Sequence, residues 1–378
     1  MAITFGTILM AMTSVIAVLA VWFSRYVLQG KTLFLCRLLI LAGDAAGIVW
    51  LVRHGLRPGE PLSAAPEMLA IVLWFMFQLI LSCLVLLAVI CRFFYRHMMA
   101  APVDMSRRRL LKKAAIYPIA AAGMSAYGGL YERSHVVERT FDVTVRGIDE
   151  TGYRLAQISD VHLGLFFTVA DLHDLLARAA ASKPDMLVIT GDLFDDIKQN
   201  DEAAAELDRW CAAFPDGIWF CLGNHEYYRG LPHIKDLLKK TQVHVLINRA
   251  EQVPGRSFWL AGVDYPFSRD KEAFRRQRAS FMTKAFEYVP QDAPVILLAH
   301  HPEFIDDGAE RRVPLVLTGH THGSQFGFFG RPLFPVFKYT RGVVRIGETF
   351  GYVHSGNGSW FPFRFGCPPE IAYFRLKI

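Results

Sequence analysis

The sequence predicts an α/β domain of β-sheets flanked by helices, preceded by an α-helical transmembrane region. Of its 378 residues, 52% are hydrophobic and the mean hydropathy is +0.25, which is too apolar for an ordinary soluble protein of this size. Long apolar stretches occupy the chain up to residue 131, and short β-like runs alternate with helical segments from residue 141 onwards. This alternation is typical of an α/β fold, and the length allows about two domains.

The charged residues are distributed unevenly between the two parts. Residues 1–140 contain 14 of the 41 Lys and Arg and 6 of the 35 Asp and Glu, which leaves 27 basic against 29 acidic residues in the rest. All the excess positive charge therefore belongs to the first part, and the second part has a net charge of −2. Because duplex binding relies on a basic surface, we do not expect a nucleic acid as partner of the second part.

Four stretches are long and apolar enough to span a bilayer, which takes roughly 20 residues. The second contains Arg37 and Asp44, which we interpret as polar residues at helix contacts rather than as an intramembrane functional site. No basic residue precedes Arg25, so the start of the chain predicts a retained anchor rather than a cleaved signal peptide. The four stretches are 3–27, 33–52, 68–94 and 114–131.

Basic residues between and after these stretches predict the topology. By the positive-inside rule both basic clusters lie in the cytoplasm, which places three spans with the N-terminus outside. A fourth span at 114–131 then puts the second part on the outer, periplasmic side of a bacterial inner membrane. If 114–131 instead packs as an interfacial helix, the second part stays in the cytoplasm. The clusters are Arg25, Lys31 and Arg37, and Arg92, Arg96, Arg107, Arg108, Arg109, Lys112 and Lys113.

The segment 106–112, Ser-Arg-Arg-Arg-Leu-Leu-Lys, resembles a bacterial twin-arginine export signal, since a mild Ala- and Gly-rich stretch follows it. The alternative is a polybasic flank that ends the third span. We therefore divide the chain into a membrane region of about three spans (1–105), a twin-arginine-like segment with a fourth span and linker (106–140), and an α/β domain (141–378).

The second part alternates predicted strands with predicted helices. The strands are 153–158, 186–190, 217–222, 257–263, 295–299 and 313–318. The helices are 169–181, 201–213, 232–240 and 271–288.

Polar residues suited to metal binding follow five of these strands. In an open α/β sheet, ligands bind at the carboxyl edge, where the strands end together and their loops converge. Five such clusters at one edge therefore predict one site. The clusters are Asp160 with His162, Asp192, Asn224 with His225, His300, and His320 with His322.

These residue types suit two divalent metal ions. Two cations about 3.5–4 Å apart need a shared anionic oxygen donor, and Asp192, which follows a strand and Gly191, is the candidate. Imidazole nitrogens with an amide oxygen favour Mn, Fe, Zn or similar ions over Mg²⁺. His320 and His322 lie two apart in a Gly-flanked loop, so each can serve a different ion.

The order and spacing of these blocks over residues 153–378 resemble the calcineurin-like metallophosphoesterase family, and within it a membrane-associated bacterial phosphodiesterase branch. The resemblance implies a calcineurin-like sandwich and a water activated between two metals, with His225 over the scissile phosphate as leaving-group acid or stabiliser. It implies that the first metal is held by Asp160, His162, Asp192 and His322. It implies that the second is held by Asp192, Asn224, His300 and His320.

Several neighbours of these residues have less certain roles. We expect His301 to face the substrate mouth or solvent rather than a metal. Glu226, Asp195 and Asp196 are interpreted as acids that support the ligands from behind or lie in solvent. The role of His354, in a Gly-rich run, stays open.

Aromatic residues concentrate near the C-terminus and have two interpretations. They form either an apolar lip beside the metals that faces a lipid-like substrate or a bilayer, or ordinary packing in the core and hairpins. We favour packing, because aromatic residues in short strands usually pack. They are Phe326, Phe328, Phe329, Phe334, Phe337, Trp360, Phe361, Phe363 and Phe365.

The sequence thus predicts a membrane-anchored, metal-dependent hydrolase of phosphodiesters or phosphomonoesters, with lipid-linked substrates as one alternative. Two other functions stay open, a cytoplasm-facing nucleotide-lipid pyrophosphatase and a catalytically silent membrane sensor or scaffold. The presence of His225 with every expected ligand argues against the silent form. The oligomeric state is not predicted.

Overall fold

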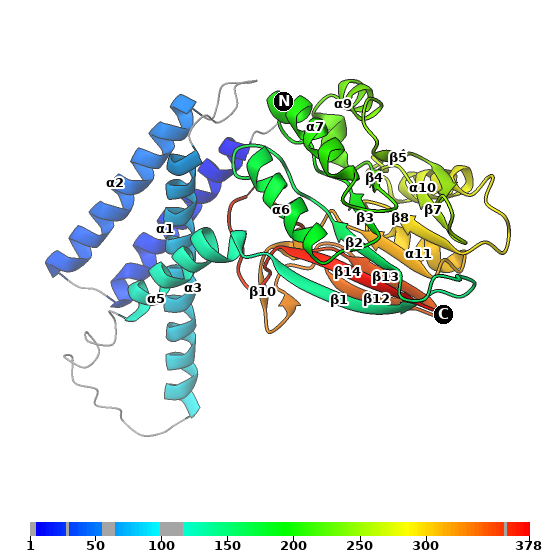
Figure 1. The fold of residues 1–378 in the computed structure, drawn as a ribbon. Coiled ribbons are helices and arrows are strands. Elements are labelled where there is room, and N and C mark those ends of the chain that lie inside the picture. The colour runs from blue at the N-terminus through cyan, green and yellow to red at the C-terminus, as the bar shows by residue number, and fades with distance from the viewer. Residues whose placement is uncertain (1–4, 28–29, 55–64, 99–115, 359–360) are drawn as a thin grey trace. The chain divides into compact units, whose positions relative to one another are not determined.

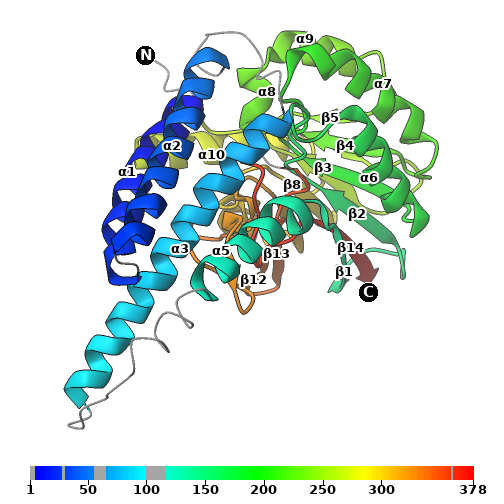
Figure 2. The ribbon, with the colours of Figure 1, turned by 90° about the vertical axis from the view of Figure 1, so that its left-hand side faces the viewer.

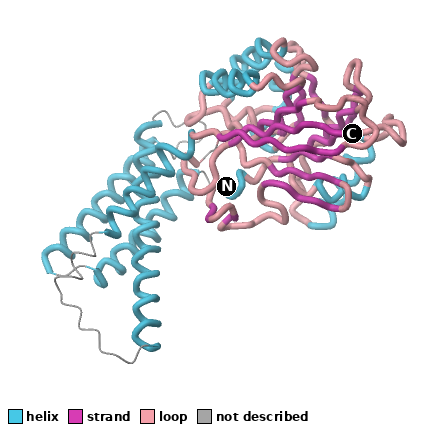
Figure 3. The backbone as a smooth tube through the Cα atoms, turned by 60° about the horizontal axis from the view of Figure 1, so that its bottom comes forward, coloured by secondary structure: helices cyan, strands magenta, loops and turns pink. Residues whose placement is uncertain are grey.

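The computed structural model describes residues 5–27, 30–54, 65–98, 116–358 and 361–378. By internal contacts the chain divides into two units, Met1–Tyr131 and Glu132–Ile378. Helices make up the described part of the first unit, whereas the second combines helices and strands (Figure 3).

The first unit is a group of apolar helices. Among the described residues, two helices are long and apolar enough to cross a membrane, at Leu33–Trp50 and Pro66–Cys91. The predicted twin-arginine-like segment at 106–112 lies outside the described residues. The helices are α1 (Phe5–Val27), α2 (Gly30–His54), α3 (Ala65–Met98) and α5 (Ile116–Ala126), which continues as a π-helical turn, Tyr127–Tyr131.

Polar side chains inside these helices join neighbouring helices. The Asp44 carboxylate accepts hydrogen bonds from Trp74 Nε1 at 2.9 Å and Gln78 Nε2 at 2.6 Å on α3. Arg37 Nε donates to the Val21 carbonyl of α1 at 3.3 Å. These contacts agree with the interpretation of Arg37 and Asp44 as helix-packing residues.

The fourth predicted span is short in its described part. The helical stretch Ile116–Tyr131 has 16 residues, which at about 1.5 Å per residue is about 24 Å, against a hydrocarbon core of about 30 Å. Ser125 Oγ donates to the Leu73 carbonyl at 2.7 Å and so fastens this helix to α3. A complete crossing would need residues that precede Ile116.

The second unit contains two six-stranded sheets, ordered β1-β14-β2-β3-β4-β5 and β12-β13-β9-β8-β7-β6 (Figure 1). The strands of the first are β1 (Val137–Thr144), β2 (Arg154–Ile158), β3 (Met186–Thr190), β4 (Ile218–Cys221), β5 (His244–Leu246) and β14 (Glu370–Lys377). Those of the second are β6 (Arg249–Gln252), β7 (Trp259–Gly262), β8 (Val295–Leu298), β9 (Leu315–Thr318), β12 (Gly342–Ile346) and β13 (Thr349–Val353).

Alternating side chains of the buried strands build the layers. In β3, Leu187 and Ile189 belong to the core beneath helices, while Met186 and Val188 belong to the core shared with the other sheet. Such alternation follows from the two-residue period of a strand. Helices α6 (Val169–Ala181), α7 (Asn200–Cys211) and α9 (Leu231–Leu238) cover the first sheet (Figure 2). Helices α10 (Lys271–Ala285) and α11 (Phe304–Glu310) cover the second.

This four-layer arrangement confirms the predicted sandwich of β-sheets flanked by helices. Strands β2, β3, β4 and β5 are mutually parallel, as are β7, β8, β9 and β13. Because parallel strands end at a common edge, the loops after β2, β3 and β4 converge, and so do those after β8 and β9. The sequence did not predict β1 and β14, which pair in parallel from Val137 opposite Glu370; β1 has a polar, largely exposed edge-strand sequence.

Candidate metal centre

The loops after five strands bring the predicted site residues together. Asp160, His162, Asp192 and His300 are buried, and α8 (Asn224–Tyr228) begins at the buried Asn224. His322 is also buried. Since these residues come from both sheets, the site lies where the carboxyl edges of the two sheets meet.

The backbone at the site is strained. Eleven described residues other than glycine have a positive φ, and five of them are predicted metal ligands. Non-glycine residues rarely adopt this conformation, which costs of order 1–3 kcal/mol each and tends to concentrate at functional sites. The five are Asp160, His162, Asp192, His320 and His322.

Gly191 allows the Asp192 loop to approach its neighbours. Its φ is +84°, and a Cβ there would lie 2.6 Å from the Gly223 amide nitrogen and 2.7 Å from His300 Nδ1. Only glycine combines this backbone conformation with so little space.

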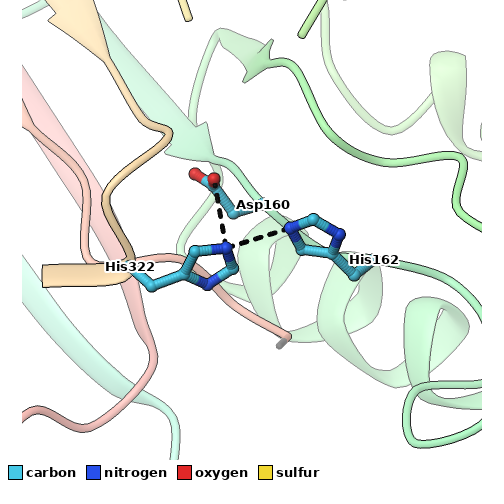
Figure 4. A group of neighbouring side chains, drawn as sticks. All are labelled: Asp160, His162 and His322. Carbon is cyan, nitrogen blue, oxygen red and sulfur yellow. Dashed lines mark hydrogen bonds and ion pairs between the residues drawn. The ribbon is translucent and has the colours of Figure 1, made fainter. Parts of the chain in front are cut away.

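Asp160, His162 and His322 form a first donor group (Figure 4). His322 Nε2 lies 3.0 Å from His162 Nε2 and 3.6 Å from Asp160 Oδ1. Ser159 Oγ donates to the Asp160 carboxylate at 2.6 Å, and the His320 amide donates to it at 2.9 Å. The carboxylate is thus fixed by groups from both sheets.

Asp192, His300 and His320 form a second donor group. His300 Nε2 lies 3.0 Å from Asp192 Oδ2 and 3.2 Å from His320 Nδ1. His300 Nδ1 lies 2.6 Å from the Thr190 carbonyl, which can only accept, so Nδ1 carries a proton. This hydrogen bond directs Nε2 towards the other donors. Tyr265 OH, which the sequence did not identify, lies 3.2 Å from His320 Nε2.

Asp192, a member of the second donor group, also faces the first. Its Oδ2 is 3.0 Å from His300 Nε2 and 3.7 Å from His162 Nε2, while its Oδ1 accepts from the His225 amide at 2.8 Å. Oδ2 therefore faces one imidazole of each group, the position that a bridging oxygen would take.

The donor set fits two cations. Asn224 Oδ1 is buried and has no hydrogen-bond partner among the described residues, although a buried amide oxygen normally has one. The facing imidazole nitrogens of His162 and His322, 3.0 Å apart, direct nitrogen donors at a common point. Carboxylate, imidazole and amide donors of this kind suit borderline divalent metals.

Burial and the charges of neighbouring site residues shift the pKa values of the donor side chains. Burial lowers the pKa of His300, but the Asp192 carboxylate outweighs burial and raises it to about 10. Burial raises the pKa of Asp192, but His300, His225 and His162 bring it well below its usual value. Burial, reinforced by His300, holds the pKa of His320 well below its ordinary value. A cation bound by His300 would have to displace its proton.

Asp195 connects the first donor group to His225. Its carboxylate accepts from His162 Nδ1 at 3.0 Å, His225 Nδ1 at 2.7 Å and Arg229 Nε at 2.8 Å. Burial lowers the pKa of His225, but the hydrogen bond to Asp195, with Asp192, raises it above its ordinary value. Asp195 therefore orients the rings of His162 and His225, whereas the sequence left open whether it supports the ligands or lies in solvent.

Other neighbours of the site have structural contacts. Glu226 is fully buried and accepts from the amides of Asp192, Leu193, Phe194 and Gly223, which ties the second and third site loops together.

His301 and His354 are buried. The expectation that His301 faces the substrate mouth or solvent was wrong, because its ring packs against Phe274, Phe337 and Tyr265. His354 Nδ1 accepts from the Gly356 amide at 2.9 Å.

The aromatic residues near the C-terminus divide between packing and exposure. Phe363 is buried and stacks on Phe326, as the packing interpretation predicts. Phe328, Phe329 and Phe334 are exposed, and for them that interpretation is wrong.

A cavity of the catalytic unit lies away from the metal centre. It has a volume of about 830 Å³ and is lined by residues such as Arg146, Pro290, Arg312 and Glu348, with none of the two donor groups. Its wall includes the residues that precede β8 and β9, at the opposite edge of the second sheet. This cavity is thus separate from the metal centre.

Comparison with known proteins identifies the family. The profile of the calcineurin-like phosphoesterase family matches residues 153–324. The chain is 31% identical over 294 residues to YkuE of Bacillus subtilis, an uncharacterised metallophosphoesterase, covering 72% of this chain and 98% of that protein. It is 28% identical over 236 residues to the phosphodiesterase YaeI of Escherichia coli, covering 59% and 82%.

A transmembrane protein with a metallophosphoesterase domain from Danio rerio is 31% identical over 240 residues, and the match covers 60% of this chain and 53% of that protein. The match to YkuE extends over nearly the whole of that relative. With the five loop clusters assembled into two donor groups, the chain belongs to the calcineurin-like phosphoesterase family of metal-dependent phosphoester hydrolases.

Proposed function

We propose that this chain is a membrane-anchored phosphoesterase with two metal ions, that it hydrolyses phosphodiester or phosphomonoester bonds, and that its catalytic unit faces the periplasm. The observation that carries the catalytic proposal is the position of Asp192 Oδ2 between His300 Nε2 and His162 Nε2, at 3.0 and 3.7 Å. A single carboxylate shared by two donor groups is what a two-metal site needs.

The two cations are assigned to the two donor groups. The imidazole-rich donors favour Mn, Fe or Zn. The first cation would be held by Asp160, His162, Asp192 and His322. The second would be held by Asp192, Asn224, His300 and His320.

When bound, the cations supply Lewis acidity that acidifies the attacking water and offsets charge on the phosphoryl oxygens. His225 gives a proton to the leaving oxygen. Because Nδ1 of His225 is engaged by Asp195 at 2.7 Å, Nε2 is the atom that faces the substrate, and the raised pKa favours the protonated ring. Asp195 acts through His225 and His162 as a positioning residue.

His225 has a competing role as a ligand. Its ligand atoms lie within 4.8 Å of those of His162 and Asp192, so distance alone would allow it to bind a metal. We assign it to the leaving group because Asp195 already holds its Nδ1. Metal content of a His225 variant separates the two roles.

Two observations support the choice of substrate and location. The relative YaeI is named a phosphodiesterase, which makes diesters the first class to test. The apolar helices at Leu33–Trp50 and Pro66–Cys91 and the transmembrane relative from Danio rerio support membrane anchoring, which brings lipid-linked esters within reach.

The test is hydrolysis by the purified full chain, loaded separately with Mn, Fe or Zn. The panel holds bis(p-nitrophenyl) phosphate, p-nitrophenyl phosphate and a nucleotide-linked lipid pyrophosphate. We expect diester turnover that a chelator abolishes and metal restores, and that Asp192→Ala lacks while the nearby Asp196→Ala keeps it. Cleavage of the pyrophosphate alone would favour the pyrophosphatase alternative, and metal binding without any turnover would favour the silent sensor.

A further inference from the structure

Exposed apolar side chains concentrate in one short segment of the catalytic unit. Of the eleven large hydrophobic residues exposed in the described part of this unit, five lie within residues 328–336, and Phe329 and Val336 are 94% and 83% exposed. Scattered exposed apolar residues are normal, but a contiguous group indicates an interaction surface. We call this segment the apolar lip; its five residues are Phe328, Phe329, Leu333, Phe334 and Val336.

The tip of the lip is a strained hairpin turn. Strands β10 (Gly327–Phe328) and β11 (Arg331–Pro332) pair through Phe329 and Gly330, both with positive φ, +48° and +78°. Such turns favour Asn or Gly, and a bulky residue pays a steric cost there. Phe329 is almost fully exposed, and its ring meets the neighbouring Phe328 ring edge-on with centroids 4.6 Å apart, so burial in the domain does little to offset this cost.

The base of the lip is fixed to the domain. The Gly327 amide donates to the Phe365 carbonyl at 2.7 Å, and the Leu333 amide donates to the Phe326 carbonyl at 2.9 Å. Phe326 in turn stacks on the buried Phe363, with ring centroids 5.6 Å apart. The exposed tip is therefore presented by a rigid support.

The lip adjoins the metal centre. It begins six residues after His322 in the sequence. Phe337, directly after the lip, packs its ring centroid 5.0 Å from that of His320 and 5.8 Å from that of His301. A partner seated on the lip would lie beside the second donor group.

The charge of this region differs from that of the rest of the domain. Residues 321–347 contain no Asp or Glu and four basic residues, although residues 141–378 have a net charge of −2. Arg331 is exposed within the hairpin, whereas Lys338 is paired with Asp306 at 2.8 Å. Apolar tips flanked by basic residues suit the surface of an anionic bilayer.

We propose that the apolar lip inserts into the headgroup region of the bilayer, so that the metal centre acts on phosphoester headgroups of membrane lipids. This inference rests on the proposed phosphoesterase function. A bilayer fits better than a protein partner because the apolar helices of the same chain keep the catalytic unit tethered to a membrane. In the reaction, water adds to phosphorus, the bond from phosphorus to the leaving alkoxide breaks, and that oxygen takes a proton; a lipid diester gives a phosphomonoester and an alcohol.

Site-specific photocrosslinking tests the insertion directly. The full chain is reconstituted in vesicles of phosphatidylethanolamine and phosphatidylglycerol with p-benzoylphenylalanine in place of Phe329. The matched control carries it in place of Tyr288, which is 81% exposed and precedes β8 at the opposite sheet edge. We expect lipid adducts at position 329 and not at 288. Equal labelling at the two positions, no lipid adduct at 329, or a protein adduct there overturns the proposal.

Kinetics test whether insertion serves catalysis. The double variant Phe329→Ser with Val336→Ser is compared with Tyr288→Ser, on phospholipid in the same vesicles and on soluble bis(p-nitrophenyl) phosphate. Because only the bilayer substrate needs the lip, we expect a loss of about tenfold or more on phospholipid and turnover of the soluble diester within about twofold of the unmodified chain. An equal loss on both substrates would mean a structural role and would overturn the proposal.

The unmodified chain separates this inference from the function on which it rests. Hydrolysis of the soluble diester without hydrolysis of vesicle phospholipid would reject the lipid-substrate inference and leave the phosphoesterase proposal standing. Hydrolysis of neither substrate by the metal-loaded chain would reject both.

Discussion

At the scale of single residues, the proposed chemistry requires His225 to be held in place without binding a metal. Its amide donates to Asp192 Oδ1 at 2.8 Å and its Nδ1 to Asp195 at 2.7 Å. Its backbone thus contacts the shared carboxylate while its ring is oriented by a different acid. Removing the ring should disturb proton transfer more than metal binding.

His225→Gln should therefore retain two metals per chain and lose about 10²- to 10⁴-fold in turnover, the usual contribution of a general acid. The loss should shrink for nitrophenolate esters, whose leaving groups need little protonation. Steady-state rates over a series of leaving groups and elemental analysis measure both effects. Loss of a metal ion would make His225 a ligand, and an equal loss for every leaving group would argue against proton transfer.

Asp195→Asn should shift the pH dependence of turnover. The negative charge of Asp195 helps to raise the pKa of His225 against the effect of burial, and an acid works only while it is protonated. Without that charge the pKa of His225 falls, so the alkaline limb of the pH–rate profile should move to lower pH. Asp196→Asn, one residue along, is the control, because the Asp196 carboxylate accepts from the Lys198 amide and from Gln199 Nε2. An unmoved alkaline limb with intact metal content would remove Asp195 from this role.

At the scale of elements, the strained backbone of the site lies in the loops that follow the strands. The strands themselves are regular and buried, whereas Asp160, Asp192 and His320 adopt positive φ in the residues that follow them. Packing of β3 and of the strands around it must offset the free-energy cost of these conformations. Space at these loops is also tight, since a Cβ added at Gly191 would lie 2.6 Å from the Gly223 amide nitrogen.

Gly191→Ala should destabilise the protein more than a matched change elsewhere. Gly255 has a similar φ, +73°, but nothing lies within 4 Å of its added Cβ. Gly255→Ala should cost only the steric penalty of the conformation, about 1–2 kcal/mol, while Gly191→Ala adds the overlap with His300 and Gly223. We expect a lower melting temperature and lower metal affinity for Gly191→Ala than for Gly255→Ala. Equal melting temperatures and equal metal affinities would show that the close approach has no such effect.

Elements with strong local signals were predictable from the sequence. The buried strand β3 and helix α6 match the predicted ranges residue for residue, because a continuous apolar run and a 3.6-residue period identify them. The edge strand β1 was missed, because its polar sequence forms a strand only by pairing with β14 at the far end of the chain.

The site was predictable in composition but not in detail. Sequence order placed the candidate ligands after successive strands, and parallel pairing brought them to one edge. The shared role of Asp195 and the contact of Tyr265 with His320 could not be predicted, since they depend on loop conformations that no local pattern specifies. The exposure of Phe329 likewise depends on tertiary structure.

At the scale of the whole molecule, the proposed periplasmic location of the catalytic unit requires a complete fourth span. The described helix Ile116–Tyr131 has 16 residues, close to the lower limit for a crossing. The periplasmic proposal thus depends on residues that precede it.

Reporter fusions after Ser134 decide the side, with fusions after residue 103 as the cytoplasmic control. We expect active alkaline phosphatase after Ser134 and fluorescent green fluorescent protein after residue 103. Arg107→Lys with Arg108→Lys should block export of the full catalytic unit if the twin-arginine route carries it. Inactive alkaline phosphatase after Ser134 would place the unit in the cytoplasm, and unaffected export of the double variant would reject the twin-arginine interpretation.

The most direct test of the two-metal centre is anomalous diffraction from crystals of the zinc-loaded chain. We expect two peaks about 3.5–4 Å apart, each about 2.0–2.2 Å from a carboxylate oxygen of Asp192. One peak should be surrounded by Asp160, His162 and His322, and the other by Asn224, His300 and His320. A single peak, or a peak bound by His225 in place of these ligands, would contradict the assignment of two metals to the two donor groups.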